Sequence, residues 1–220
     1  MLIAASGFED LSMQKSALLL TLGFCFVGSL AHAEETLTVK VEGGGASPAV
    51  LQAMEKEAET ALAPSGIHLI WKLGPGELGE VFSTPLAIIR LRGECRPRPI
   101  RPRAVLDHPI SEGQPLGQTH ISDGQILPIA DVLCDSIWDF TSRELTATSP
   151  NLRAELLGRA VGRVTAHELY HILLRTTSHA REGIARAEQT SADLLAPDKS
   201  FSEEDDRRMS LFTAESESGK

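Results

Sequence analysis

The feature that most constrains this chain is a long helical pattern in its C-terminal half. Ser149-Pro150 predicts the start of the helix, because serine is a favoured N-cap residue and proline is favoured at the first helical position. Apolar residues then recur with helical spacing at Leu152, Leu156, Leu157, Ala160, Val161, Val164, Ile172 and Leu174. The pattern predicts one amphipathic helix from Pro150 to about Leu174, with its apolar stripe facing a core.

The same stretch contains the segment His167-Glu168-Leu169-Tyr170-His171, which matches the pattern H-E-x-x-H. Residues four apart lie on one face of a helix, so His167 and His171 can both offer an imidazole nitrogen to one metal ion. Glu168 is one position further round, where its carboxylate can act as a general base on a water held by that metal. Both histidines lie close to the apolar stripe and are expected to face inward. The alternative is two helical histidines with ordinary hydrogen bonds beside a solvated glutamate.

A third metal ligand is expected shortly after the helix, because catalytic zinc sites usually have three protein ligands and one water. His179 is the favoured residue, since the poor helix formers at 176–178 can turn the chain back towards the metal. Glu182 and Glu188 are the acidic alternatives, and a second helix within residues 185–195 could present Glu188. A site without a further protein ligand also stays open.

His167, Glu168 and His171 with a following histidine resemble the metzincin branch of zinc peptidases, which have H-E-x-x-H-x-x-G-x-x-H and then a methionine-bearing turn under the metal. Leu174 stands at the family's glycine, Thr177 at its third histidine, and Ala185 where the methionine is expected. The closer resemblance is to small secreted bacterial zincin-like proteins. These have seven residues between the second and third histidines and then Gly-Ile, as in His179 and Gly183-Ile184. The resemblance is specific over about residues 158–187.

This resemblance implies an α/β (α+β) zincin-like domain, in which a mixed sheet packs on the long active-site helix. It implies that His167, His171 and His179 hold Zn²⁺ and that Glu168 is the catalytic residue. The sole tyrosine is Tyr170, inside the motif, so no downstream tyrosine can help to bind the transition state.

The N-terminus has the features of an export signal. Lys15 precedes a mostly apolar run over residues 17–30, and Ala31-His32-Ala33 is a cleavage site of the A-x-A type. The acidic residues upstream suit no export signal, so Met13 is expected to be the true start within the signal region 1–33. A retained membrane anchor is the alternative, although the run is short for a membrane span.

Cleavage after Ala33 would leave residues 34–220, expected to form a single secreted or periplasmic domain. Export favours a disulfide between Cys95 and Cys134, and two separate buried thiols are the alternative. The formal net charge is −9, which makes nucleic acid a poor partner. No stable membrane insertion is expected after cleavage.

Alternating apolar residues and turn residues place the remaining elements. Strands are predicted at 37–41, 67–73 and 85–92, and a strand or irregular hairpin at 116–127 around Ser122-Asp123-Gly124. Helices are predicted after Ser47-Pro48, over residues 129–140, and from Ser202 onwards. This order is that of an α/β domain in which an edge strand borders the cleft and can pair with an extended peptide.

An arginine-rich, proline-rich segment and two isolated histidines lie outside these motifs. The arginines are expected to form a solvated loop rather than a basic rim for acidic substrates; they are Arg90, Arg92, Arg96, Arg98, Arg101 and Arg103. His108 and His120 could line the cleft, but surface positions are the more common outcome.

Together these features predict an exported zinc metallopeptidase that hydrolyses protein or peptide substrates. The alternative is a non-catalytic exported zinc-binding module with a structural metal site, closed by a fourth protein ligand. A binding protein without any metal is the third interpretation.

Overall fold

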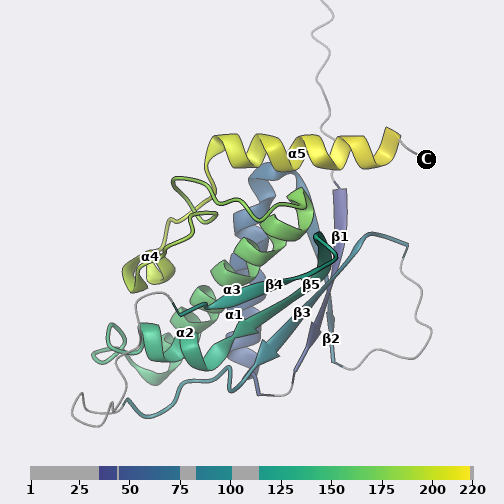
Figure 1. Cartoon of the computed structure of the whole chain (residues 1–220). Helices are drawn as coiled ribbons and strands as arrows, with labels where there is room; N and C mark the ends of the chain where they lie inside the picture. Colours follow the sequence, from purple (N-terminus) through teal and green to yellow (C-terminus); the bar gives the residue numbers. More distant parts are fainter. Residues whose placement is uncertain (1–34, 44, 75–82, 101–113, 219–220) are drawn as a thin grey trace, which may run out of the picture. The chain divides into compact units, whose positions relative to one another are not determined.

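The computed structural model describes residues 35–43, 45–74, 83–100 and 114–218 of the chain (Figure 1). The expected export segment, Arg101, Arg103 and His108 lie outside these residues. The strands are β1 Glu35–Glu42, β2 Ile67–Leu73, β3 Leu86–Arg92, β4 Gly117–Ser122 and β5 Gln125–Leu133. The helices are α1 Pro48–Leu62, the short 3₁₀ helix η1 Ala63–Ser65, α2 Cys134–Thr141, α3 Pro150–Leu174, α4 Ser191–Leu195 and α5 Glu203–Ser218.

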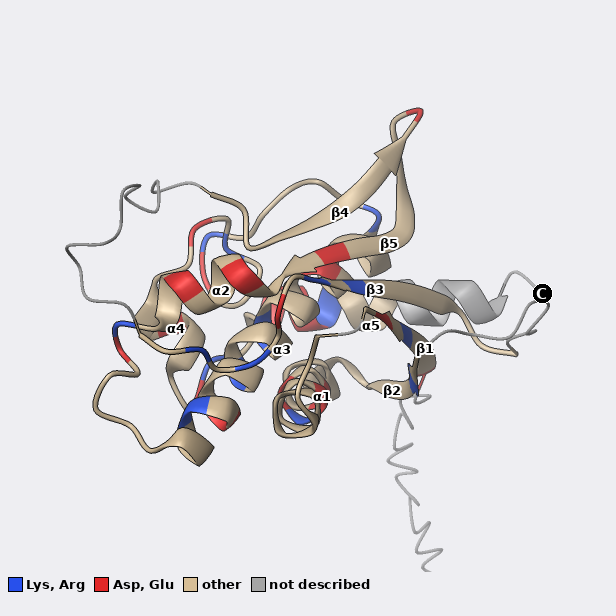
Figure 2. Ribbon diagram, turned by 90° about the horizontal axis from the view of Figure 1, so that it is seen from below, with Lys and Arg blue, Asp and Glu red and all other residues tan. Residues whose placement is uncertain are grey.

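The five strands form one mixed sheet in the order β2-β1-β3-β5-β4. β1 is parallel to β2 and β3, and β3 is parallel to β5, whereas β4 is antiparallel to β5 and lies at the edge. Leu37, Val39 and Val41 alternate with more polar residues along β1 and are all buried. Helices α1 and α3 cover that apolar face (Figure 2). The expected α/β (α+β) class, with a mixed sheet on a long helix, is confirmed.

Helix α3 has the bounds that its sequence pattern predicts. The Ser149 side chain accepts a hydrogen bond from the Leu152 backbone N–H, and Pro150 occupies the first turn. Two glycines one turn apart allow α1 to approach closely: a Cβ at Gly158 would lie 2.6 Å from the Val50 carbonyl oxygen, and one at Gly162 would lie 2.6 Å from that of Met54. The contact fixes α3 beside α1 on the same face of the sheet.

Two expected helices differ from the structure. Residues 129–133 belong to β5, and the helix expected over 129–140 begins only at Cys134. The run Ile129 to Leu133 is apolar except for Asp131, and such a short run suits a strand as well as a helix. Within 185–195 only Ser191–Leu195 is helical, because Thr190 and Asp193 form a capping box that starts α4 there.

The expected disulfide is present between Cys95, which follows β3, and Cys134, the first residue of α2. Their Cα atoms are 4.9 Å apart and both residues are fully buried. Among the described residues, no helix has the length and apolar character that crossing a bilayer requires.

Candidate metal centre

His167 and His171 face one another across one turn of α3. The His167 Nδ1 lies 2.8 Å from the Ile184 carbonyl oxygen, and the His171 Nδ1 lies 2.7 Å from that of Thr176. A carbonyl oxygen can only accept, so each Nδ1 must carry the hydrogen. The two Nε2 atoms, which therefore present lone pairs, are 3.1 Å apart.

Two facing lone pairs at this distance repel unless a proton or a cation lies between them. Burial, together with the neighbouring His171 and His179, lowers the pKa of His167 to about 4, although the hydrogen bond to Ile184 partly opposes the shift. Burial also lowers the pKa of His171, which is 6% exposed. Both rings are thus neutral near pH 7, the form that binds metals. Two ligands about 2.1 Å from one zinc in tetrahedral geometry lie about 3.4 Å apart, so the observed spacing fits a shared ion.

His179 completes a group of three imidazoles. Helix α3 ends at Leu174, and its C-cap Arg175 adopts the left-handed conformation with φ 47°, after which the chain turns back. The His179 ring centroid lies 4.7 Å from that of His171 and 5.2 Å from that of His167. The ligand nitrogens of the three residues all lie within 4.8 Å of one another, so they could hold a metal ion. The other two ligand candidates, Glu182 and Glu188, do not belong to this group.

Glu168 lies beside the group and is almost fully buried, with 4% of its surface exposed. Burial raises the pKa of its carboxyl to about 7, and the Thr119 hydroxyl, 2.6 Å from Oε2, partly opposes that rise. Gly117 lies over the other oxygen, because a Cβ built there would be 2.5 Å from Oε1. Strand β4 therefore positions the Glu168 carboxylate in two ways. Thr119 donates a hydrogen bond to it, and Gly117, which has no side chain, leaves room for it.

An open cleft of about 1310 Å³ lies over the three histidines. Its walls come from β4, from Phe140 on α2, from α3, and from the segment after His179. Gly117, Gln118 and Thr119 line it on the side of the edge strand. A molecule in this cleft can touch the histidines, Glu168 and the β4 backbone together.

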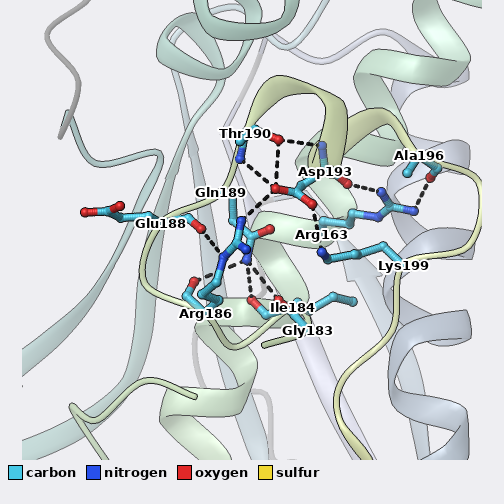
Figure 3. A network of polar contacts seen from close by, with 10 residues as sticks. All are labelled: Arg163, Gly183, Ile184, Arg186, Glu188, Gln189, Thr190, Asp193, Ala196 and Lys199. Carbon is cyan, nitrogen blue, oxygen red and sulfur yellow. Dashed lines mark hydrogen bonds and ion pairs between the residues drawn. The ribbon is translucent and has the colours of Figure 1, made fainter. Parts of the chain in front are cut away.

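The segment of residues 183–199 lies against α3, and we call it the support segment. Arg163, one turn before His167, is 2% exposed and donates to the Asp193 and Ala196 carbonyls and to Glu57 on α1. Asp193 in turn accepts from Arg186 at 2.7 Å and from Lys199 at 2.8 Å (Figure 3). The polar network ties the support segment to α3, the helix that carries His167 and His171.

The remaining residues considered from sequence lie elsewhere. In the arginine-rich segment, each arginine that the structure describes is paired with an acid: Arg90 with Glu42, Arg92 with Asp131, Arg96 with Glu94, and Arg98 with Asp135 and Asp139. His120 pairs with Asp131 at 3.0 Å and does not line the cleft. Tyr170 is buried, and its hydroxyl bonds Asp205 and Arg208 on α5.

Sequence reasoning missed Thr119, Gly117 and Gln189, which contact Glu168 or the turn beside His167. Each is a single polar or small residue without spacing relative to the H-E-x-x-H motif. Only the pairing of β4 with β5, and its approach to α3, bring Thr119 and Gly117 to the site. No sequence signal could have identified them.

Comparison of the chain with protein-family models, with curated proteins and with solved structures gives no significant match. The fold and the site therefore define the class by themselves. This is a mixed α/β domain with a three-histidine group, able to hold a metal ion, in an open cleft beside a buried glutamate.

Proposed function

We propose that this chain is an exported zinc-dependent metallopeptidase of the zincin type. The observation that carries the proposal is the pair of Nε2 atoms 3.1 Å apart, each on a ring whose Nδ1–H is held by a backbone carbonyl. A set of three neutral imidazoles suits zinc among the common metals. The assignment extends to His179 because its ring completes the group.

Zinc, when bound by these three residues, supplies a Lewis acid that polarises a carbonyl and makes a water nucleophilic near neutral pH. Glu168 takes the proton from the attacking water and returns it to the leaving amine. The Thr119 hydroxyl holds Oε2, and Oε1, which has no side-chain hydrogen bond among the described residues, is the oxygen that we assign to this proton transfer. A pKa of about 7 for the unliganded Glu168 suits a group that must accept a proton and then donate it.

A protein or peptide is the substrate that best fits the cleft. β4 is an edge strand, and its residues Gly117, Gln118 and Thr119 line the cleft next to the histidines. An extended peptide can add to such an edge by backbone hydrogen bonds, which places a scissile carbonyl over the metal ligands.

A structural zinc site is the rival interpretation, and it requires a fourth protein ligand. Within the described part of the chain, the convergent group contains three residues, and the Glu168 carboxylate is engaged by Thr119. A zinc ion held by these three residues in an accessible cleft would keep room for a water, which supports the enzyme over the structural module.

The substitution Glu168→Gln tests the proposal. It should lower the rate of peptide cleavage by about 10²- to 10⁴-fold, because general-base catalysis contributes that much, while zinc stays bound. Cleavage of a peptide library and zinc content are measured on the same preparations. Glu155→Gln is the matched control, since Glu155 is an exposed glutamate on the same helix. A fully active Glu168→Gln protein, or a zinc-loaded wild type that cleaves no peptide, would contradict the proposal.

A further inference from the structure

The Ile184 carbonyl orients the metal ligand His167. It accepts the His167 Nδ1–H at 2.8 Å, and the same oxygen lies 3.2 Å from Nε2 of Gln189. A carbonyl oxygen has two lone pairs, so both donors can be accommodated at once. The direction of the His167 ring therefore depends on where this one oxygen is held.

Gln189 holds the turn that contains this oxygen. Its Nε2 lies 3.1 Å from the Gly183 carbonyl oxygen and 3.2 Å from that of Arg186, besides its contact with Ile184. The turn thus curls around one side-chain amide, as Figure 3 shows. No other side chain donates to these three carbonyls among the hydrogen bonds of the described residues, apart from His167 itself.

Gln189 is itself fixed from both sides. Arg186 donates to the Glu188 carbonyl at 2.5 Å and to the Asp193 carboxylate at 2.7 Å. On the other side, Thr190 donates to Asp193 through its N–H and its hydroxyl. Arg163 then clamps the Asp193 carbonyl to α3, one turn before His167. Through Asp193 and Arg163, these contacts connect the residues on both sides of Gln189 to α3, the helix that carries His167.

We propose that Gln189 is a positioning residue of the metal centre: by holding the Ile184 carbonyl, it aims the His167 Nε2 at the ion. Partners of this kind fix the tautomer and orientation of metal-bound histidines, and their loss typically costs 10- to 100-fold in metal affinity. The inference rests on the metal site of the proposed function but not on hydrolysis.

The test is the zinc dissociation constant of the full chain, measured by competition with a chromophoric chelator. Gln189→Ala and Gln189→Glu should each bind zinc about 10- to 100-fold more weakly than the wild type. Glutamate keeps the length of the side chain but, once ionised, offers no N–H to the carbonyls. Gln52→Ala is the matched control, since Gln52 is exposed on α1, and it should bind zinc like the wild type.

Circular dichroism of the metal-free proteins accompanies the titration. If Gln189→Ala is unfolded, Gln189→Glu and Gln189→Met decide in its place, because both keep the side-chain length. Wild-type affinity in any folded variant that lacks the amide would overturn the proposal. Unfolding of all three variants would also overturn it, since Gln189 would then serve folding rather than the metal centre.

The two proposals can fail separately. A wild type that binds no zinc removes both the metallopeptidase and the role of Gln189. A wild type that binds zinc, with Gln189 variants that bind it equally well, removes only the role of Gln189. A zinc-binding protein that cleaves no peptide leaves the affinity result intact.

Discussion

At the scale of single residues, burial acts in opposite directions on two neighbours in the chain. It lowers the pKa of His167 to about 4 and raises the pKa of Glu168 to about 7, because it disfavours the charged form of each. Both side chains are thereby neutral in the metal-free protein near pH 6. A bound cation would favour the ionised carboxylate and compete with protons for the imidazole. The pocket thus keeps His167 Nε2 unprotonated and the Glu168 carboxyl protonated in the metal-free protein.

These two shifts make opposite contributions to stability. As pH falls from 6.5 to about 4, the unfolded chain binds a proton at His167 that the folded chain does not, so the free energy of unfolding falls. As pH falls from about 7 to 4.5, folded Glu168 binds a proton that the unfolded chain does not, so the free energy of unfolding rises. Between pH 4.5 and 6.5 the two contributions largely cancel.

The substitution Glu168→Gln should remove this compensation in the metal-free protein. Its free energy of unfolding should fall, relative to the wild type, by roughly 1 kcal/mol for each pH unit between 6.5 and 4.5. Urea denaturation in the presence of a chelator at several pH values measures the difference. Glu155→Gln should follow the wild type. Parallel curves for Glu168→Gln and the wild type would show that Glu168 does not bind its proton in the folded state.

The sequence predicted the ligands better than the residues that support them. His167 and His171 are related by the helical repeat, and His179 follows in a segment that cannot continue the helix, so local rules suffice to bring the three together. Gln189 reaches His167 only through a backbone carbonyl five residues earlier in the chain. A hydrogen bond from a side chain to a backbone carbonyl requires no particular residue at the accepting position. The sequence therefore gives no pattern from which the contact could be predicted.

At the scale of elements, the site depends on how closely β4 approaches α3. Thr119 bonds the Glu168 carboxylate, and Gly117 lies so near that a Cβ would be 2.5 Å from Glu168 Oε1 and 2.8 Å from a methyl carbon of Val164. The strand and the helix are thus in contact where the base is seated. The same strand is the edge on which a substrate is proposed to bind.

Gly117→Ala should therefore displace the carboxylate without removing any ligand. Misplacing a catalytic group by about 1 Å can cost about 10²-fold, so we expect a loss of that size in peptide cleavage with unchanged zinc content. Ser122→Ala is the control on the same strand, because Ser122 is exposed and bonds only Asp123 among the described hydrogen bonds. Wild-type activity in Gly117→Ala would mean that the carboxylate is not seated by β4.

The predicted elements that differ from the structure lie in segments whose residue pattern is compatible with more than one secondary structure. Residues 129–133 are a short run that is apolar except for Asp131, and their pairing with β3 makes them a strand. As an alternative, residues 185–195 could have contained a helix that presents Glu188, but hydrogen bonds of Gln189 and Arg186 hold residues 185–190 in an irregular turn. Tertiary contacts determine the secondary structure of both segments, and these contacts could not be inferred from local propensity.

At the scale of the whole molecule, the site joins parts of the chain that are distant in sequence. The cleft combines β4, the end of α2, the C-terminal half of α3 and the support segment. The Cys95–Cys134 disulfide fixes the start of α2 to the chain after β3, a separation of 39 residues. Cysteine content and the expected export signal favoured such a bond, but only the strand order, with β5 beside β3, brings the two cysteines together.

The central claim is that His167, His171 and His179 bind one zinc ion, and metal stoichiometry tests it most directly. Zinc per chain is measured by atomic emission after loading and dialysis, for the wild type and for each histidine changed to alanine. We expect about one zinc per chain in the wild type and in the control His120→Ala, and almost none in the three site variants. A wild type without zinc, or site variants that all retain it, would contradict the account.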